Sequence, residues 1–192
     1  GSEMCIRDRS MTETPKWYDA HLSHFQEVAY IKNREDYDRL YRESIESPET
    51  FWARQAEEYL TWEKKWNSVL DYDFEAGRIA WFSGGRLNVC ANCLDRHLEK
   101  AGDKTAYYWE GDNPSDAKSV TYRELYEQVN RMAAVLKAKG VRKGDRVIIY
   151  MPVIIELPVT MLACARIGAV HSVVFGGFSS EALANRIKDC GA

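Results

Sequence analysis

The sequence predicts an α/β fold, in which a helical, tryptophan-rich N-terminal extension precedes the first part of a partly parallel sheet with helices on both faces. Two observations lead to this prediction. Five of the six tryptophans lie within the first 81 residues, and residues 34–60 carry the periodicity and caps of two helices. Two apolar runs, 147–151 and 169–175, then flank an apolar segment long enough for a helix, which is typical of a strand–helix–strand unit.

The first ten residues have neither helical periodicity nor helix caps, and Gly1-Ser2 is typical of a cleavage scar. We therefore expect residues 1–10 to be a non-native or unstructured leader. The extension is expected to span residues 11–100, and the sheet-containing domain residues 101–192.

Two helices are predicted in the extension. Within residues 34–46, apolar side chains recur at offsets 0, 3, 4 and 8 from Tyr37, on one face of a helix. Ser47, Pro48 and Glu49 then supply an N-cap, a proline at the first helical position and an acid near the positive end of the helix dipole. A second helix should therefore run to about Leu60.

The tryptophans of the extension allow two interpretations. An ordinary aromatic core is the commoner use of such side chains. A stacking platform for a sugar or base would favour basic neighbours, but the residues between the tryptophans are as acidic as they are basic. The sequence favours the aromatic core.

A hairpin and a helix are predicted at the start of the second domain. Residues 105–109 and 118–121 favour strands, with a turn-rich segment between them. Thr121 and Glu124 have the spacing of a capping box, and apolar residues then recur at helical spacing until Gly140.

The strand–helix–strand unit follows. Residues 147–151 are apolar throughout, and residues 169–175 are apolar apart from His171 and Ser172, which favours strands buried on both faces. Between them, residues 157–167 predict a buried helix that ends at Gly168. Two strands linked in this way should be parallel, with a right-handed crossover. Ser179 is expected to cap a last helix.

Gly176 and Gly177 lie between the second strand and the last helix. Ligands of open parallel sheets bind beyond the carboxyl ends of the strands, where glycine permits close approach and a helix offers free N–H groups. A tight turn without a ligand is the alternative. The chain has neither a G-x-G-x-x-G nor a G-x-x-x-x-G-K-[ST] motif, so neither a dinucleotide-binding fold nor a P-loop is supported.

Other polar residues leave alternatives open. Cys90, Cys93 and His97 have the spacing of a zinc or redox site, but the sequence offers no fourth ligand in a second cluster. Glu156 and Arg166 lie within the most apolar predicted helix, either as a surface stripe or as a paired buried charge.

The composition excludes several classes. The chain has 26 basic and 29 acidic residues, so no basic field draws it to nucleic acid or to an anionic membrane. The longest apolar stretch, 147–165, is interrupted by prolines and a glutamate, which argues against a membrane span. The five scattered cysteines follow no secretory signal and favour a reducing, cytoplasmic location.

Several long strings together resemble the AMP-forming acetyl-CoA synthetases, within the acyl-adenylate-forming ligases. They are WFSGGRLNVCANCLDRH (81–97), VTYRELYEQVNRMAAVLKAKGVRKGDRVIIYMP (120–152) and MLACARIGAVHSVVFGGFSSEALANRI (161–187). The resemblance covers nearly everything from Glu35 to Cys190.

This resemblance implies that residues 11–100 are the family's N-terminal extension and that residues 101–192 are the start of its AMP-binding adenylating domain, which is incomplete. It implies an acetate–CoA ligase: acetate and Mg-ATP give acetyl adenylate and pyrophosphate, and the thiol of coenzyme A then displaces AMP. Phe175, Gly176 and Gly177 match a family position where the backbone lies against the adenine end of coenzyme A.

The family's phosphate loop, acetate pocket, ribose-binding aspartate and adenylation lysine lie beyond residue 192. The resemblance therefore implies a segment that is inactive by itself, with no catalytic residue and no metal ligand, while the sites for ATP and Mg lie outside this chain. By the same resemblance, Cys93 and His97 are packing residues.

Three alternatives stay open. One is a segment of a propionyl-CoA synthetase, because the acyl pocket lies outside this chain. Another is a non-catalytic interaction module that binds a partner through its tryptophan-rich region, and the third is a small zinc or redox protein that uses Cys90 and Cys93. Self-association through the unfinished sheet is also expected, because strands 147–151 and 169–175 need neighbours. The other expected partners are the small molecules acetate, ATP and coenzyme A.

Overall fold

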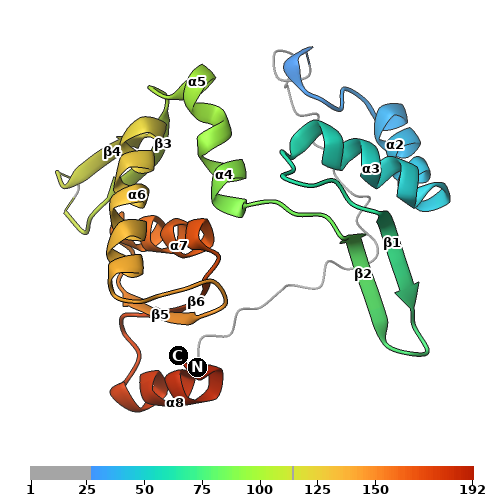
Figure 1. Ribbon diagram of the computed structural model, residues 1–192. Helices are drawn as coiled ribbons and strands as arrows, with labels where there is room; N and C mark the ends of the chain where they lie inside the picture. The colour runs from blue at the N-terminus through green and yellow to red at the C-terminus, as the bar shows by residue number, and fades with distance from the viewer. Residues whose placement is uncertain (1–26, 114) are drawn as a thin grey trace, which may run out of the picture. The chain divides into compact units, whose positions relative to one another are not determined.

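The computed structural model describes residues 27–113 and 115–192 (Figure 1). The chain divides into two compact units, the first ending at Phe51 and the second beginning at Trp52. The predicted leader, residues 1–10, lies outside the described residues, as does Trp17.

Both predicted helices of the extension are confirmed. Helix α2 (Arg34–Glu46) begins at Asn33, whose side-chain oxygen accepts a hydrogen bond of 2.7 Å from the Asp36 N–H. This bond satisfies one of the free donors of the first turn. Helix α3 (Pro48–Tyr59) starts at the proline that the sequence indicated, and the Phe51 N–H donates to Ser47 O.

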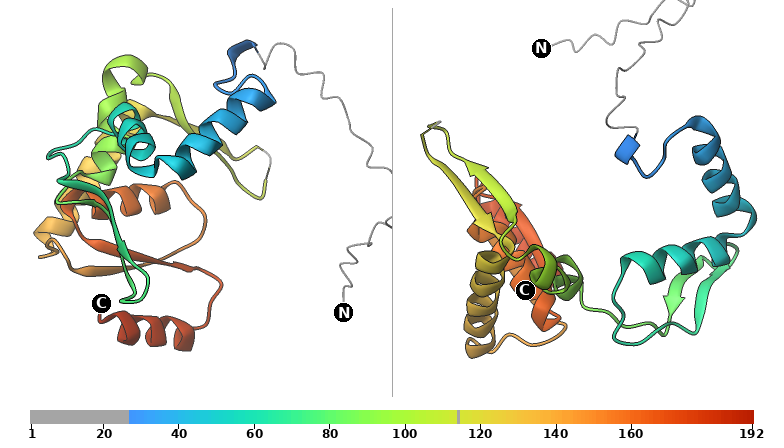
Figure 2. Two further views of the ribbon diagram at one scale, coloured as in Figure 1. Left: turned by 90° about the vertical axis from the view of Figure 1, so that its right-hand side faces the viewer. Right: turned by 90° about the horizontal axis from the view of Figure 1, so that it is seen from above.

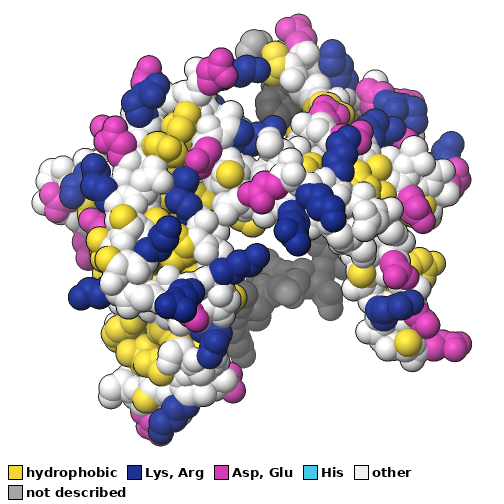
Figure 3. Space-filling model, viewed as in Figure 1, with side chains coloured by type: hydrophobic (Ala, Val, Ile, Leu, Met, Phe, Trp, Pro, Cys, Tyr) yellow, Lys and Arg dark blue, Asp and Glu magenta, His cyan; other side chains and the backbone are white. Residues whose placement is uncertain are grey.

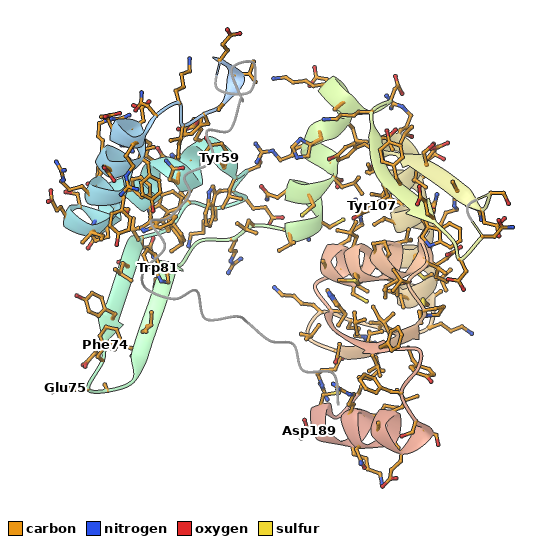
Figure 4. All side chains as sticks on the ribbon, turned by 180° about the vertical axis from the view of Figure 1, so that it is seen from behind. Tyr59, Phe74, Glu75, Trp81, Tyr107 and Asp189 are labelled. Atoms are coloured by element: carbon orange, nitrogen blue, oxygen red, sulfur yellow. The ribbon has the colours of Figure 1, made fainter. Side chains whose placement is uncertain are left out.

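The second unit contains a hairpin that the sequence analysis did not predict. Strands β1 (Ser68–Asp73) and β2 (Arg78–Ser83) pair antiparallel, with Leu70 opposite Trp81. Phe74 and Glu75 lie at its tip (Figure 4). The extension is therefore only partly helical.

Aromatic rings pack beside this hairpin. The rings of Trp62 and Trp66 are 4.8 Å apart between centroids, and that of Phe82 lies 5.5 Å from the first and 5.0 Å from the second. Phe82 has a positive φ of 50°, which costs about 1–3 kcal/mol in a residue other than glycine. Contact with both tryptophans offsets this cost, which fits an aromatic core rather than a stacking platform.

Three short helices follow this hairpin along the chain. They are α4 (Val89–Cys93), the 3-10 helix η1 (Asp95–His97) and α5 (Leu98–Ala101). Cys90 and Leu94 are fully buried here, in one core cluster with residues of the later helices.

The second hairpin and its helix agree with the sequence. Strands β3 (Thr105–Glu110) and β4 (Ala117–Thr121) pair antiparallel and lead into α6 (Tyr122–Ala138). The capping box is present: the Glu124 N–H donates to Thr121 Oγ1 at 3.2 Å, and the Thr121 N–H donates to Glu124 Oε2 at 2.8 Å. It satisfies two donors that a helix start leaves free.

The strand–helix–strand unit is parallel, as predicted. Strand β5 (Arg146–Met151) pairs with β6 (Val170–Phe175) in a regular parallel register. Helix α7 (Glu156–Ile167) connects them and ends at Gly168, whose φ of 75° only glycine adopts without strain. The six described strands thus pair as β1–β2, β3–β4 and β5–β6, in three separate two-stranded sheets.

Helices cover both faces of the β5–β6 pair (Figures 1 and 2). Helix α7 lies over one face, with α6 packed against it, and α8 (Ser180–Cys190) lies along the other. Across residues 27–113 and 115–192, we find no helix with the length and apolarity that a membrane crossing needs.

The capping box gives a first testable prediction. Thr121→Ala should lower the free energy of unfolding by about 1 kcal/mol, because it removes the side chain that caps α6. Ser119→Ala is the matched control, since Ser119 is exposed and its hydroxyl makes no hydrogen bond among the described residues. Urea unfolding followed by circular dichroism measures both, and equal stabilities would contradict the capping role.

The stabilisation by this capping box should depend on pH. Hydrogen bonds from the N–H of Thr121, and then from its hydroxyl, hold the pKa of Glu124 below its usual value. A carboxylate whose pKa is lowered by folding stabilises the protein at neutral pH, and its contribution is lost as the pH falls through the lowered pKa. The stability difference between wild type and Thr121→Ala should therefore shrink in acid.

Candidate functional site

The predicted ligand-binding residues form a turn at the carboxyl end of β6. The Phe178 N–H donates to Phe175 O at 3.1 Å, which closes the turn around the two glycines. Ser179 then begins α8, and its Oγ accepts a hydrogen bond of 3.2 Å from the Ala182 N–H. The turn thus lies where ligands of parallel sheets bind, between a strand end and a helix start.

The two glycines serve different purposes, and neither has a left-handed φ. A Cβ atom added to Gly176 would lie 3.2 Å from Pro152 N and 3.3 Å from the Met151 carbonyl carbon. Gly176 therefore permits a close approach of the turn to the end of β5. A Cβ added to Gly177 would meet the Phe175 ring at 2.7 Å, and a ring can rotate away as a backbone cannot.

Aromatic rings are exposed at this turn. The side chains of Phe175 and Phe178 are 59% and 46% exposed, and their rings pack edge to face with centroids 6.3 Å apart. The guanidinium of Arg186 lies 5.4 Å from the centroid of the Phe178 ring. Figure 3 shows apolar side chains gathered where the β5–β6 pair meets α8. A flat heterocycle could stack on such rings.

Tyr150, which the sequence analysis did not single out, contacts the same turn. Its hydroxyl oxygen lies 2.9 Å from both Gly176 O and Phe178 O. A tyrosine within an apolar strand was the available signal, because its hydroxyl needs a polar partner.

Two cavities lie elsewhere in the second unit. One of about 410 Å³ lies between the β3–β4 hairpin, α6 and the start of α7, and Lys118 and Glu156 are among its lining residues. Another, of about 530 Å³, includes Asn88 and His171 in its lining. Neither of these two cavities includes the 175–178 turn in its lining.

Cys90, Cys93 and His97 do not share one environment, and the packing role expected of Cys93 is wrong because its side chain is exposed. Cys90 is fully buried whereas Cys93 is exposed, and the His97 ring lies 5.7 Å from that of Tyr122. Burial raises the pKa of the Cys90 thiol, so it is a poor nucleophile and a poor metal ligand. In the part of the chain that the structure describes, no three His, Cys, Asp or Glu side chains are placed to hold a metal ion.

Arg166 is a paired, mostly buried charge and not part of a surface stripe. Its Nη1 and Nη2 donate to the two carboxylate oxygens of Asp95 at 2.9 and 2.6 Å. The guanidinium also lies 5.2 Å from the ring centroid of Tyr126. Burial lowers the pKa of Arg166, but its interactions with Asp95 and Cys90 outweigh this effect, so the net direction is upward. Glu156, by contrast, is exposed at the start of α7.

Asn88 joins the same two segments. Its Oδ1 accepts from the Ala91 N–H at 3.1 Å and so caps α4. Its Nδ2 lies 3.2 Å from Ala165 O and 3.1 Å from Arg166 O, at the carboxyl end of α7. One side chain therefore bonds to a free N–H group at the start of α4 and to free carbonyl groups at the end of α7.

The sequence matches two family models. Residues 37–93 match the acetyl-coenzyme A synthetase N-terminus, and residues 94–192 match the AMP-binding enzyme model.

Similar curated proteins include the acetyl-coenzyme A synthetase of Magnetococcus marinus, 60% identical over 157 residues, which are 82% of this chain and 24% of that protein. The acetyl-coenzyme A synthetase 2 of Pseudomonas aeruginosa is 58% identical over 161 residues, 84% of this chain and 25% of that protein. The chain thus spans about a quarter of the length of the relatives it matches. Among solved structures, the acetoacetyl-CoA synthetase from Streptomyces lividans has a TM-score of 0.70 at 31% identity, covering 78% of this chain and 23% of that one.

The Arg166–Asp95 ion pair gives a second prediction. Asp95→Asn should lower the free energy of unfolding by about 1–3 kcal/mol, because the guanidinium then stays buried without its charged partner. Asp103→Asn is the matched control, since its pair with Arg123 is exposed and should contribute less than about 1 kcal/mol. Urea unfolding measures both variants. Equal losses of unfolding free energy would show that the Arg166–Asp95 pair stabilises the protein no more than an exposed pair does.

Proposed function

Because this chain belongs to the AMP-binding enzyme family and is an N-terminal segment of the acetyl-coenzyme A synthetase type, we propose that it is part of an acetate–CoA ligase. The whole enzyme would join acetate to AMP with release of pyrophosphate, and then transfer the acetyl group to the thiol of coenzyme A. The observation that carries this proposal is the identity of 60% with an acetyl-coenzyme A synthetase over 157 residues.

Within that reaction, we assign this segment to the second step. Phe175, Gly176 and Gly177 form the surface for the adenine end of coenzyme A. Two features support the assignment: the turn follows the carboxyl end of a parallel strand, and its phenylalanine rings are exposed instead of packed in the core. A ring on the surface gains free energy when a base covers it, and this gain contributes to binding.

Adenylation is assigned to other parts of the proposed enzyme. The residues that the structure describes offer no cluster that fits a magnesium ion, and we assign the magnesium site to other parts of the enzyme. The segment by itself is proposed to be inactive. A cytoplasmic location agrees with the free thiols of Cys90, Cys93, Cys164 and Cys190. Self-association through the edges of the β5–β6 pair stays a prediction.

A propionyl-CoA synthetase is the second candidate, because no residue that we assign here contacts the acyl group. The non-catalytic module and the zinc protein have less support. The tryptophan-rich region packs on itself, and the buried Cys90 is unsuited to a metal.

The test of the proposed function is acetate-dependent exchange of pyrophosphate into ATP. The full-length protein should catalyse this exchange and form acetyl-CoA, with acetate preferred to propionate. The 192-residue chain alone should give no rate above a heat-killed control. Exchange by the chain alone would contradict the assignment of adenylation to other residues, and preference for propionate would favour the second candidate.

Substitution of the two glycines tests the proposed coenzyme A surface. In the full-length protein, Gly177→Leu should raise the KM for coenzyme A roughly tenfold or more, a loss of at least about 1.4 kcal/mol of binding free energy, while exchange and melting temperature stay near those of wild type. Its side chain displaces the Phe175 ring from the ligand face.

Gly176→Ala is the matched comparison. Its Cβ would press against the backbone of Met151 and Pro152, so we expect a loss of about 1–3 kcal/mol of stability and a parallel fall of both half-reactions. A folded, active Gly177→Leu enzyme with an unchanged KM for coenzyme A would remove Gly177 from the site.

A further inference from the structure

One side chain of the neighbouring strand contacts two carbonyl groups of the 175–178 turn. Tyr150 lies near the end of β5, and its hydroxyl oxygen is 2.9 Å from Gly176 O and 2.9 Å from Phe178 O. A phenol has one proton, which these two carbonyl groups share or exchange. Both carbonyl groups are therefore directed toward β5.

The direction of the carbonyl groups determines the direction of the N–H groups. No peptide bond of the described residues is cis, and in a planar trans peptide the C=O and the next N–H point in opposite directions. The N–H groups of Gly177 and Ser179 consequently point away from Tyr150. Within residues 27–113 and 115–192, neither N–H has a hydrogen-bond acceptor.

Helix α8 is fixed at its other end by a different residue of the same strand. The guanidinium of Arg146, at the start of β5, donates to Cys190 O and Gly191 O, at the carboxyl end of α8. The two ends of β5 thus have separable roles: Arg146 anchors the helix, and Tyr150 orients the turn.

We propose that Tyr150 is a positioning residue for coenzyme A binding, which turns the N–H groups of Gly177 and Ser179 toward the nucleotide. The ring nitrogens and phosphate oxygens of an adenine nucleotide are acceptors that match these donors. This inference rests on the proposed function and adds to it a residue that does not itself touch the ligand. The Phe175 ring beside the turn supplies the apolar part of the same surface.

Tyr150→Phe in the full-length protein is the test, because it removes only the hydroxyl oxygen. The KM for coenzyme A should rise roughly two- to tenfold, the loss expected for one hydrogen bond that orients the site. The rate of acetate-dependent pyrophosphate exchange and the melting temperature should remain those of wild type, since the ring keeps its packing.

Pantetheine, which carries the thiol but lacks the nucleotide, separates positioning from a general structural effect. With pantetheine as acceptor, wild type and Tyr150→Phe should have the same kcat/KM. Equal losses with coenzyme A and pantetheine would overturn the proposal, because the hydroxyl would then act on the whole active site and not on the nucleotide surface.

Two control variants complete the design. Tyr108→Phe removes a hydroxyl from an 82% exposed tyrosine of β3 and should change nothing. Arg146→Met should lower the melting temperature without changing the KM for coenzyme A, since it loosens the far end of α8.

An Arg146→Met enzyme with the same rise in KM as Tyr150→Phe would overturn the proposal in favour of simple docking of α8. An unchanged KM in Tyr150→Phe would overturn it directly, with the proposed function intact. A wild-type protein without acetate-dependent exchange would overturn the proposed function and this inference together.

Discussion

The pairing of one largely buried guanidinium constrains how the α4–η1 segment packs on α7. Arg166 lies near the end of α7, and a charge without a partner there would cost far more than one hydrogen bond contributes. Its partner, Asp95, comes from η1, 71 residues earlier in the chain. The bidentate geometry allows little freedom, so the α4–η1 segment must lie against α7. Since α7 is the crossover of the parallel pair, the same contact constrains the start of β6, and through β6 the turn that follows.

Local signals in the sequence predicted the elements that depend on local interactions. The capping box at Thr121 needs only two residues three positions apart, and the run before Gly168 needs only a helical period and a glycine. The β1–β2 hairpin was missed because its turn has no Asn-Gly or Asp-Gly pair, and because apolar and polar residues do not alternate regularly along its strands. Short strands of this kind are stabilised by cross-strand pairs such as Leu70 and Trp81, which no local pattern specifies.

The same division holds for the candidate site. The place of Phe175, Gly176 and Gly177 at the end of a parallel strand was predictable, because strand, turn and helix follow one another in the sequence. The need for glycine at position 176 was not predictable, because the atoms that it approaches belong to Met151 and Pro152, at the end of β5. Likewise, the spacing of residues around Arg166 could not identify Asp95 as its partner. Side chains that meet across many residues require the fold before their roles can be assigned.

The double role of Asn88 has a consequence for the order in which the protein forms during synthesis. The amide caps α4 but also bonds to Ala165 and Arg166, and the second of these is 78 residues downstream. A ribosome that adds about 5–20 residues per second needs roughly four to sixteen seconds to make that stretch. During this interval, Asn88 and Asp95 have no partner from α7, and the core cluster around Cys90 and Leu94 lacks Val159 and Ala163 of that helix. We expect the α4–η1 segment to reach its final form only after α7 has left the exit tunnel. Folding of this middle segment therefore depends on a helix that is synthesised later.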